Sequence, residues 1–552
     1  MNNAELAERL KTFANLIEIK GENSFRVSAF RRAGDLVEDF DRPVSELVAE
    51  GTLTDVQGIG PGIAAALTEM VETGQFAAMD DVLDVVPSTL LTMLDIPGVG
   101  PKTVARFYRE LGITDLMQLD AAAQRGDIRA VKGFGARQEE RIIKGIAFLN
   151  RRTGRLSIGT ALPAAEAAAR TLVTALGCDA AVAGSTRRMC ETVGNIDLVV
   201  ASEDADAIAG VAEKFASDIQ KAHSGLVTGD HDCGVRIRIQ STAPERFGTE
   251  LVRWTGSRAF VEALSADANG ELPTAASDAD LFTNMGLDVV PPELREDPAM
   301  IELAREHRLP ELITLSDLRG DLHLHSNWSD GHGTILEMAS EARALGYEYL
   351  SIADHSGGLA IARGLNADRL REQRREIERV NELVPEVRLL RASEVEVHPD
   401  GSLDFPDDVL AELDLVVASL HSALSRGIDE LTERIVKVIR NPHVDIIAHP
   451  TGRIIERRPG GTYHWETVFK VARETGTAIE INANPARLDM SDEVAREARI
   501  AGVTISIDTD AHDVSSLHLM RYGIGLARRA GIGPSDVINT RPLNQLLAWL
   551  SR

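Results

Sequence analysis

Residues 320–552 repeat one pattern seven times: an apolar run, a His, Asp or Glu at or near its end, and then a helical stretch. Near-continuous apolar runs are typical of strands that are buried on both faces, as in parallel sheets covered by helices. Seven such strands separated by helices predict a closed parallel barrel. The runs lie at 321–325, 349–355, 389–394, 415–421, 444–449, 478–482 and 503–512.

Histidine is concentrated in the same region. None of the 14 histidines precedes His223, and eleven lie between His323 and His518. Side chains at the carboxyl ends of barrel strands converge on one mouth, where barrel enzymes carry their chemistry. Imidazole and carboxylate groups ligate divalent transition metals. We therefore expect a metal centre at the barrel mouth.

This stretch resembles the PHP (polymerase and histidinol phosphatase) domain, which implies a distorted (β/α)7 barrel. In that family nine residues hold three metal ions, and carried over they are His323, His325, Asp330, His355, Glu394, His421, His449, Asp510 and His512, with no gap in the set. The resemblance implies that these residues are both catalytic and metal-binding, with Mn²⁺, Zn²⁺ or Fe²⁺ as the ion. Such ions activate a water for in-line attack on a phosphodiester and stabilise the departing oxygen. Arg363, Arg453 and Arg487 resemble the family's phosphate contacts.

Three glycine turns recur at intervals of about 37 residues in the amino-terminal part. They read Gly58-Ile59-Gly60, Gly98-Val99-Gly100 and Gly133-Phe134-Gly135, and each precedes a helical stretch. Glycine tolerates positive φ, so such a turn can present backbone N–H groups to a phosphate at a helix N-terminus. The pattern resembles the helix-hairpin-helix motif, which grips DNA backbones without reading their sequence.

Positive charge follows the second and third turns. Residues 102–155 contain twelve Lys or Arg and six acids, a net +6, whereas residues 43–101 contain no Lys or Arg. We therefore predict that phosphate is bound by Gly98, Gly100, Lys102, Gly133, Gly135 and Arg137. The first turn has Gly62 where the second has Lys102, so we expect it to pack or to bind weakly. The formal charge of −26 excludes an overall basic protein but leaves room for this local basic face.

Residues 1 to about 90 resemble the small helical amino-terminal domain of family X DNA polymerases, with Ser24–Ala33 as the best-matching stretch. Members with deoxyribose-phosphate lyase activity carry a Schiff-base lysine in the helix after the first hairpin. That position falls on Ala66 in this sequence. Alanine cannot form an imine, so we expect no lyase activity of this kind.

Residues 183–198 resemble the nucleotidyltransferase signature of the same family. The resemblance implies a palm domain with Gly184, Ser185, Arg187 and Arg188 as vestigial nucleotide contacts and Asp197 as a remaining metal ligand. Active members have two aspartates spaced one apart and a third on a neighbouring strand. Here Asn195 replaces the first, and Arg236 aligns with the third. Because two divalent ions need compensating negative charge, we expect that polymerisation is lost.

Nearly the whole chain resembles bacterial family X polymerases with a carboxy-terminal PHP domain. This resemblance implies a multidomain protein of α+β and α/β parts. The domains we expect are a helical domain with the first hairpin (1–90), a fingers-like hairpin domain (91–155), a degenerate palm (156–255), a thumb-like segment and linker (256–319) and the PHP domain (320–552).

The composition fits a folded soluble protein. Hydrophobic residues make up 44% and charged residues 26% of the chain. Three cysteines without paired spacing exclude a disulfide framework and a thiolate zinc cluster. No apolar run is long enough for a signal core or a membrane span. We expect a cytoplasmic monomer without a membrane partner.

The function we predict is that of a DNA-binding, metal-dependent phosphoesterase in base-excision repair. It would act as a 3′–5′ exonuclease, or process 3′ ends or abasic sites, on gapped, nicked, single-stranded or abasic DNA. Three alternatives stay open: a working gap-filling polymerase, a non-catalytic DNA-end binder and a small-molecule phosphatase. The complete set of nine ligands beside two degenerate sites favours the phosphoesterase.

Overall fold

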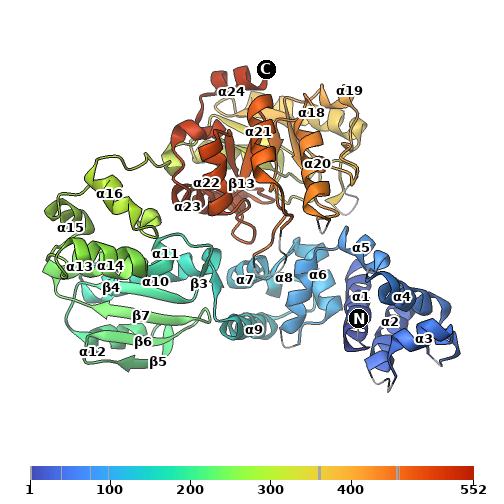
Figure 1. The fold of residues 1–552 in the computed structure, drawn as a ribbon, viewed down its shortest axis with the longest axis horizontal. Coiled ribbons are helices and arrows are strands. Elements are labelled where there is room, and N and C mark those ends of the chain that lie inside the picture. Colours follow the sequence, from blue (N-terminus) through green and yellow to red (C-terminus); the bar gives the residue numbers. More distant parts are fainter. Residues whose placement is uncertain are drawn as a thin grey trace. The chain divides into compact units, whose positions relative to one another are not determined.

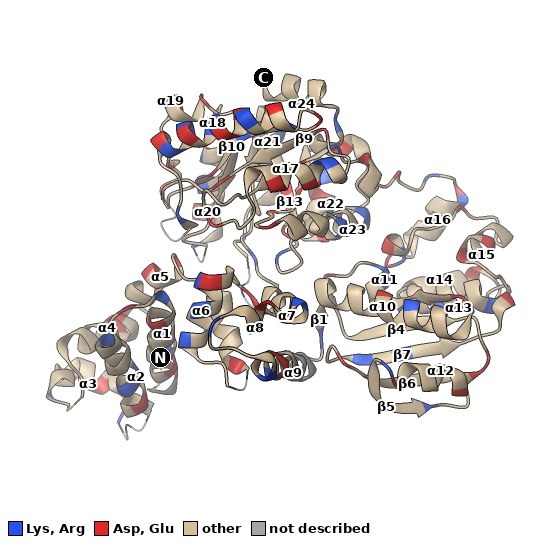
Figure 2. Cartoon of the chain, turned by 180° about the vertical axis from the view of Figure 1, so that it is seen from behind, with Lys and Arg blue, Asp and Glu red and all other residues tan. Residues whose placement is uncertain are grey.

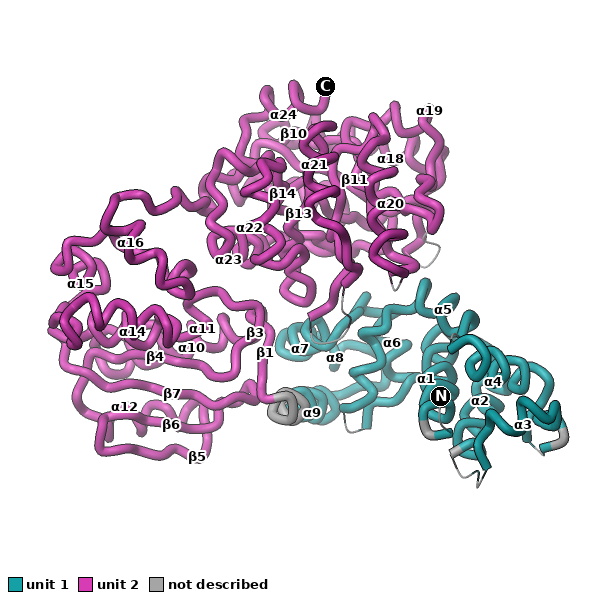
Figure 3. The backbone as a smooth tube through the Cα atoms, viewed as in Figure 1, with its two compact units in different colours: residues 1–146 teal, residues 147–552 magenta. Residues whose placement is uncertain are grey.

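The computed structural model describes residues 3–551 apart from 39, 41, 57, 75, 97, 359–361, 425, 456, 457 and 459, and for residues 4, 38, 55 and 147–153 it describes the backbone alone. Gln57 and Pro97, which directly precede the first two glycine turns, therefore lie outside the described residues, as do the side chains of Arg151 and Arg152 in the basic segment. The chain forms two compact units, residues 1–146 and 147–552 (Figure 3). The finer division into five domains stays a prediction.

The first unit is built of helices (Figure 1). They are α1 (Asn3–Lys20), α2 (Ser24–Glu38), α3 (Val44–Glu50), α4 (Pro61–Thr73), α5 (Ala77–Leu83), α6 (Pro101–Leu111), α7 (Leu116–Arg125), α8 (Asp127–Ala130) and α9 (Ala136–Thr153), with the 3-10 segments η1 (Leu53–Asp55) and η2 (Ser88–Asp95). The last helix, α9, extends beyond the end of the unit. Among the described helices of the chain, none combines the length and the apolar character that crossing a bilayer requires.

The three glycine turns share one backbone shape. Gly58, Gly98 and Gly133 have φ values of 103°, 86° and 91°, a region that glycine enters at little cost. In each case a helix begins three residues later, at Pro61, Pro101 or Ala136. The second glycine of the first two turns is extended and caps the helix that follows. The repeat therefore builds the three hairpin turns that the sequence predicts.

The second unit begins with a mixed sheet. Its strands, in spatial order, are β2 (Ala180–Val182), β4 (Asn195–Val200), β7 (Arg236–Ser241), β6 (Leu226–His231) and β5 (Ala216–Lys221). A separate two-stranded sheet joins β1 (Leu156–Ser157) to β3 (Thr192–Val193). The helices of this part are α10 (Ile158–Leu176), α11 (Gly184–Arg187), α12 (Ala205–Ala212) and α13 (Phe247–Thr255), with η3 (Pro244–Arg246).

A small helical segment follows the sheet. It contains α14 (Arg258–Asp267), α15 (Asp278–Asn284), η4 (Pro292–Leu294) and α16 (Ala299–Arg305). These elements share a core of their own, which extends from Val252 to Ala304.

Seven parallel strands then form the barrel, in sequence order around the sheet. They are β8 (Gly320–Leu324), β9 (Tyr349–Ile352), β10 (Arg388–Glu396), β11 (Leu415–Ser419), β12 (Ile446–Ile447), β13 (Ala478–Asn482) and β14 (Ile505–Asp508). The first strand meets the segment after the last one, because Leu324 bridges Ala511 and the His325 N–H donates to the Ala511 carbonyl at 2.8 Å. The (β/α)7 barrel is therefore confirmed.

Helices alternate with the barrel strands. They are η5 (Leu315–Asp317), α17 (Ile335–Ala344), α18 (Ala367–Leu383), α19 (Asp407–Leu410), α20 (Ile428–Ile439), α21 (Trp465–Thr475), α22 (Asp492–Ala501), η7 (Val514–Leu519), α23 (Met520–Arg529), η8 (Pro534–Asp536), η9 (Ile538–Thr540) and α24 (Leu543–Leu550).

Strand register directs the polar side chains into the barrel. Leu390 and Ala392 of β10 and Ala478 of β13 belong to an inner core that includes residues of all the other strands except β14. Their neighbours Leu389 and Ile479 belong to a different core, shared with the surrounding helices. Because successive side chains of a strand alternate between faces, Glu394 and Glu480 continue the inward register.

Candidate metal centre

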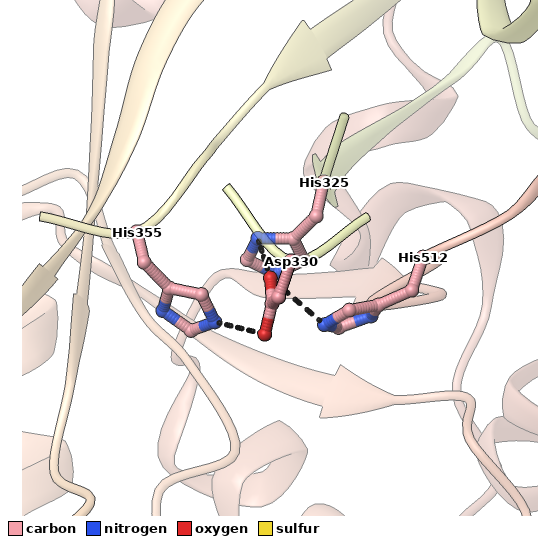
Figure 4. Close-up of side chains that lie close together, drawn as sticks. All are labelled: His325, Asp330, His355 and His512. Carbon is pink, nitrogen blue, oxygen red and sulfur yellow. Dashed lines mark ion pairs between the residues drawn. The ribbon is translucent and has the colours of Figure 1, made fainter. Parts of the chain in front are cut away.

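The nine predicted ligands lie together at the mouth of the barrel. Their ligand atoms form three groups, each within 4.8 Å: His325, Asp330, His355 and His512 (Figure 4); His323, His325 and Asp510; and His355, Glu394 and His421. His449 completes the cluster, with its Nε2 3.0 Å from Glu394 Oε1. The structure thus brings together side chains that span 190 residues of the sequence.

Each of these residues lies at or after the end of a strand. His323 is in β8, and His325 and Asp330 follow it. Glu394 lies near the end of β10, whereas His355, His421 and His449 follow β9, β11 and β12, and both Asp510 and His512 follow β14. The site is therefore the carboxyl-end mouth that the barrel prediction implies.

Burial of these polar groups shows that the residues fit metal ions. Six of the nine ligands are at most 8% exposed. Within the described part of the chain, four of their buried atoms have no hydrogen-bond partner: His323 Nε2, His325 Nδ1, Glu394 Oε2 and His449 Nδ1. Unpaired buried polar atoms are costly. Six imidazoles and three carboxylates with unsatisfied atoms form a donor set suited to divalent transition metals.

Two further carboxylates orient the histidines. His323 Nδ1 donates to Glu480 Oε1 at 2.7 Å, and His421 Nδ1 donates to Glu396 Oε2 at 2.6 Å. The Nε2 atoms of these histidines then face Glu394, at 3.6 and 3.4 Å. A carboxylate that binds one ring nitrogen in this way fixes the tautomer and leaves the other nitrogen for a metal. Our sequence analysis missed Glu396 and Glu480, although both share the inward register of their strands.

A buried carboxylate holds the loop that carries Asp330. Asp354 is 0% exposed and accepts hydrogen bonds from Ser326 N at 2.8 Å, Ser326 Oγ at 2.6 Å and Ser329 Oγ at 2.5 Å. It also accepts one from Gln373 of α18. The sequence signal for this role is its place at the end of the β9 apolar run, directly before His355. Asp354 therefore positions Asp330 without being one of the predicted ligands.

The cluster holds protons where cations would bind. Burial favours neutral Glu394, but the imidazoles of His355, His421 and His323 outweigh this and keep the pKa of Glu394 well below its usual range. Burial, together with His512 and His355, lowers the pKa of His325 to about 4. Burial opposes the charge on His512, yet Asp330 and Asp510 raise the pKa of His512 to about 9. Metal binding must therefore displace protons from some of these groups.

The three predicted phosphate arginines differ in their surroundings. Arg487 Nε lies 3.8 Å from Asp510 Oδ2, and among the described residues its Nη1 is buried without a hydrogen-bond partner. Arg453 instead donates to the Arg487 carbonyl at 2.9 Å and to Glu191 Oε2 at 2.8 Å. Arg363 is exposed, and its carbonyl accepts a hydrogen bond from Arg369 at 2.8 Å. Of the three, Arg487 is the one that the structure places beside the ligand cluster.

An arginine that the sequence analysis did not single out lies close to Arg487. Burial and the charge of Arg487 lower the pKa of Arg458 to about 10. The Asp489 carboxylate acts in the opposite direction, and Arg458 donates to the Gly452 carbonyl at 2.9 and 2.6 Å.

The hairpin residues lie at two corresponding places in the first unit. Gly98 and Gly100 precede α6, and Gly133 and Gly135 precede α9. Lys102 and Arg137 are the second residues of these helices, and both are exposed. Figure 2 shows further basic positions on α6 and α9. Exposed cations in the first turn of a helix are available to a phosphate at its N-terminus.

The polymerase-like site contains an internal cation. Asp197 of β4 is 4% exposed and accepts two hydrogen bonds from Arg238 of β7, at 2.6 and 2.9 Å. Arg236, which aligns with the third acid, is exposed, lies opposite Asn195 in the sheet and donates to Thr228 Oγ1 at 3.2 Å. Since residues two apart in a strand share a face, both arginines are on the Asp197 side of β7, and it is Arg238 that neutralises the carboxylate.

The arginines of the predicted triphosphate turn have protein partners. Arg187, in the turn that begins with Gly184 and Ser185, donates to Asp278 Oδ2 at 2.8 Å. Arg188 donates to Glu296 Oε1 at 2.7 Å and to the Thr255 carbonyl at 2.6 Å. Asp278 also accepts from the fully buried Arg295 at 3.0 Å. These contacts join the turn to the helical segment after the sheet.

Fold and site together define the class of this protein: helix-hairpin-helix units and a nucleotidyltransferase-like sheet on one chain with a PHP barrel. Comparison with known proteins agrees. A family model described as "Helix-hairpin-helix domain" matches residues 1–76, and another described as "SAM-like Helix-hairpin-helix tandem" matches residues 90–147. The DNA polymerase/3′-5′ exonuclease PolX of Bacillus subtilis is 35% identical over 577 aligned residues that cover 100% of both chains. The chain belongs to the PolX family of bacterial family X DNA polymerases with a carboxy-terminal PHP domain.

Shorter relatives match the carboxy-terminal part. A protein named probable phosphatase from Thermoanaerobacter sp. is 31% identical over 236 residues, 40% of this chain and 89% of its own length. Another from Acetivibrio thermocellus is 34% identical over 203 residues, 35% of this chain and 78% of its own length.

Proposed function

We propose that this chain is a metal-dependent phosphodiesterase that acts on DNA in repair, as a 3′–5′ exonuclease or in processing 3′ ends and abasic sites. The observation that carries the proposal is the convergence of nine His, Asp and Glu side chains at the barrel mouth with four unsatisfied buried atoms. The PolX relative that matches the full length is named an exonuclease, and the shorter relatives are named phosphatases. Both names describe hydrolysis of phosphate esters, and the hairpins favour DNA as the substrate of this chain.

Three groups of ligand atoms would hold the ions. The bound ions would supply an activated water and Lewis-acid stabilisation of the departing oxygen. Glu480 and Glu396 hold His323 and His421 with their Nε2 atoms toward Glu394. Asp330 and His512 are about one-third exposed, with 34% and 35% of their side chains accessible, so the substrate would approach from their side of the cluster.

The protein's own residues would hold the scissile phosphate. Arg487 presents a buried guanidinium nitrogen that is unsatisfied within the described residues, close to Asp510. A planar guanidinium can bind two phosphate oxygens at once, which would fix the phosphorus relative to the cluster. The hairpins after Gly98 and Gly133 would bind the DNA backbone without sequence preference.

The polymerase-like site would be inactive. One aspartate remains at the expected metal position, and it is paired with Arg238 through two hydrogen bonds. A second candidate is gap-filling synthesis, favoured by the word polymerase in the name of the Bacillus subtilis relative. Template-directed extension of a primer on gapped DNA by pure protein with Mg²⁺ or Mn²⁺ would establish that candidate and refute the inactive core.

The experiment compares wild type with the double variant His323→Ala plus His325→Ala on end-labelled single-stranded, gapped and abasic DNA with Mn²⁺. We expect wild type to shorten or cleave the DNA and the double variant to lose this activity. Equal cleavage by both proteins would contradict the assignment of the activity to the barrel mouth. Turnover of phosphomonoesters without cleavage of any DNA would favour a small-molecule phosphatase, and binding without either reaction would favour a DNA-end binder.

A further inference from the structure

The small β1–β3 sheet of the polymerase-like part contacts the barrel loop that carries Arg487. Ser157 of β1 lies opposite Thr192 of β3, and the Ile158 N–H donates to the carbonyl of Glu191 at 3.0 Å. Ser157 Oγ donates to the Pro485 carbonyl at 3.3 Å, and Glu191 Oε2 accepts from Arg453 at 2.8 Å. Ser157 of this sheet is therefore linked to residues 484–489 directly, and Glu191, which directly precedes β3, is linked to them through Arg453.

Arg453 connects Glu191 to that loop. Its Nε donates to the Arg487 carbonyl at 2.9 Å, and the Nη2 that binds Glu191 also donates to the Leu488 carbonyl. The Arg453 side chain is 17% exposed and that of Glu191 is 42% exposed. A guanidinium that is shielded from water and holds several acceptors in fixed positions is more rigid than an exposed ion pair.

The loop needs such support because of its backbone. Leu488 has a φ of 40°, in the left-handed region that non-glycine residues rarely adopt. Such conformations persist where surrounding contacts hold them. Here the side chain of Asp489 also accepts from Thr451 Oγ1 at 2.8 Å. The result is that Arg487 Nε lies 3.8 Å from Asp510 Oδ2 at the edge of the cluster.

We propose that Glu191, assisted by Ser157, is a positioning residue of the barrel site. Through Arg453 it holds residues 484–489 so that Arg487 can meet the substrate phosphate. This inference rests on the proposed phosphodiesterase function and assigns the degenerate polymerase-like part a role in hydrolysis. Glu191 belongs to the stretch that resembles a nucleotidyltransferase signature, but its partner in this structure is the barrel.

A matched control variant is available on the same side of the barrel. Glu166 of α10 accepts from Arg521 of α23 at 2.6 Å, so it also joins the polymerase-like part to the barrel, but at a helix instead of the Arg487 loop. The variants to compare are Glu191→Ala, Glu191→Gln and Glu166→Ala. The glutamine variant removes the charge and keeps the shape, so it guards against misfolding of the alanine variant.

The first measurement is hydrogen–deuterium exchange in the metal-free protein, which is independent of catalysis. The Arg487 and Leu488 amides both donate to the Asn484 carbonyl at 2.8 Å and should be protected in wild type. We expect exchange in residues 484–490 to accelerate about 5-fold in Glu191→Ala, less in Glu191→Gln and not in Glu166→Ala. Unchanged exchange in both Glu191 variants would overturn the positioning role.

The second measurement is steady-state hydrolysis of bis(p-nitrophenyl) phosphate by the Mn²⁺-loaded protein. We expect Glu191→Ala to raise KM about 5-fold with little change in kcat, and to add nothing when Arg487→Ala is already present. Equal effects of Glu191→Ala with and without Arg487→Ala would overturn the proposal. A wild type that hydrolyses neither this diester nor DNA would contradict the proposed function, while the exchange measurement would still decide the positioning role.

Discussion

The barrel mouth and the polymerase-like site both contain buried carboxylates that belong to strands, Glu394 of β10 and Asp197 of β4, yet the two sites differ in what neutralises them. At the mouth, Glu394 is surrounded by imidazoles and retains an oxygen that has no hydrogen-bond partner among the described residues. At the other site, Asp197 has both oxygens bound by Arg238. A carboxylate whose charge an arginine already compensates has little affinity left for a divalent ion. The capacity for metal therefore depends on the neighbours as much as on the acid itself.

The arginines of the two sites show the same contrast. Arg187 donates to Asp278 and Arg188 donates to Glu296, so both guanidinium groups make structural ion pairs within the protein. Arg487 keeps a buried nitrogen without a hydrogen-bond partner in the described structure, next to the ligand cluster. A buried guanidinium nitrogen without a hydrogen-bond partner is typical of a site that binds a ligand. A guanidinium bound by carboxylates of the protein is typical of a structural contact.

The same chemical change at both sites gives the largest expected difference. Glu394→Gln should lower Mn²⁺-dependent hydrolysis of DNA about 1000-fold, because Glu394 contacts five of the six imidazoles, an effect of about 4 kcal/mol on the barrier. Asp197→Asn should leave the rate within about 2-fold of wild type. Rates measured on labelled single-stranded DNA check both. A fall of similar size in Asp197→Asn would remove the distinction between the sites.

The carboxylates behind the histidines should have a smaller effect. Glu480→Gln leaves every proposed ligand in place but weakens the contact that orients His323, so we expect Mn²⁺ affinity to fall about 10- to 100-fold. Isothermal titration calorimetry measures this change. Glu474→Gln, at an exposed position of α21, is the control and should bind as wild type does. Unchanged affinity in Glu480→Gln would show that His323 needs no such orientation.

Protons should compete with metal ions for the ligands at the barrel mouth. His512 has a pKa raised to about 9, so between pH 7 and 9 an ion that binds there must displace a proton. Mn²⁺ affinity should therefore rise with pH by up to about tenfold per unit and level off near pH 9. In His512→Ala this dependence should become weaker. A Mn²⁺ affinity that is flat from pH 7 to 9 in wild type would contradict the protonated cluster.

Removal of the arginine from the polymerase-like site should affect stability instead of activity. Arg238→Met leaves the buried Asp197 without its partner, and we expect unfolding by urea to become easier by about 2 kcal/mol. Asp197→Leu added to Arg238→Met should recover most of this loss. Arg258→Met, which breaks an exposed pair with Glu262, should leave the urea midpoint unchanged. A stable Arg238→Met protein would mean that the ion pair is not structural.

The barrel could be predicted from the sequence because strand register is a local property, whereas the nine proposed ligands were assigned from the resemblance to the PHP domain. Glu394 and Ala392 alternate faces with Leu389 whatever the rest of the fold does. The glycine turns were predictable for the same reason, since a positive φ at Gly98 depends on the residue itself.

Contacts between distant segments were not predictable. His323 meets Glu480, 157 residues away, and Arg453 meets Glu191, 262 residues away. The register of β4 and β7 decides that Arg238 pairs with Asp197, whereas the sequence alone shows two arginines of the same alternation. Arginine is a residue type that often binds phosphate, so Arg453 was predicted as a phosphate contact. Only the fold shows that Arg453 donates to the carbonyls of Arg487 and Leu488.

The smallest expected effect concerns the hairpins. The helix after the first hairpin has no basic residue in its first turn, whereas the helix after the second hairpin has one at the equivalent position. Gly62 is the second residue of α4, as Lys102 is of α6, and the space around Gly62 is open. Lys102→Ala should reduce the slope of log affinity for DNA against log salt by about 0.9, and Gly62→Lys should increase it by a similar amount if that hairpin also reaches a phosphate. Lys144→Ala, which removes a partner of Glu140, is the control. Fluorescence anisotropy with labelled gapped DNA at several salt concentrations measures these slopes. An unchanged slope in Lys102→Ala would show that the second hairpin does not bind phosphate through this lysine, and would leave the third hairpin with Arg137 as the remaining hairpin candidate.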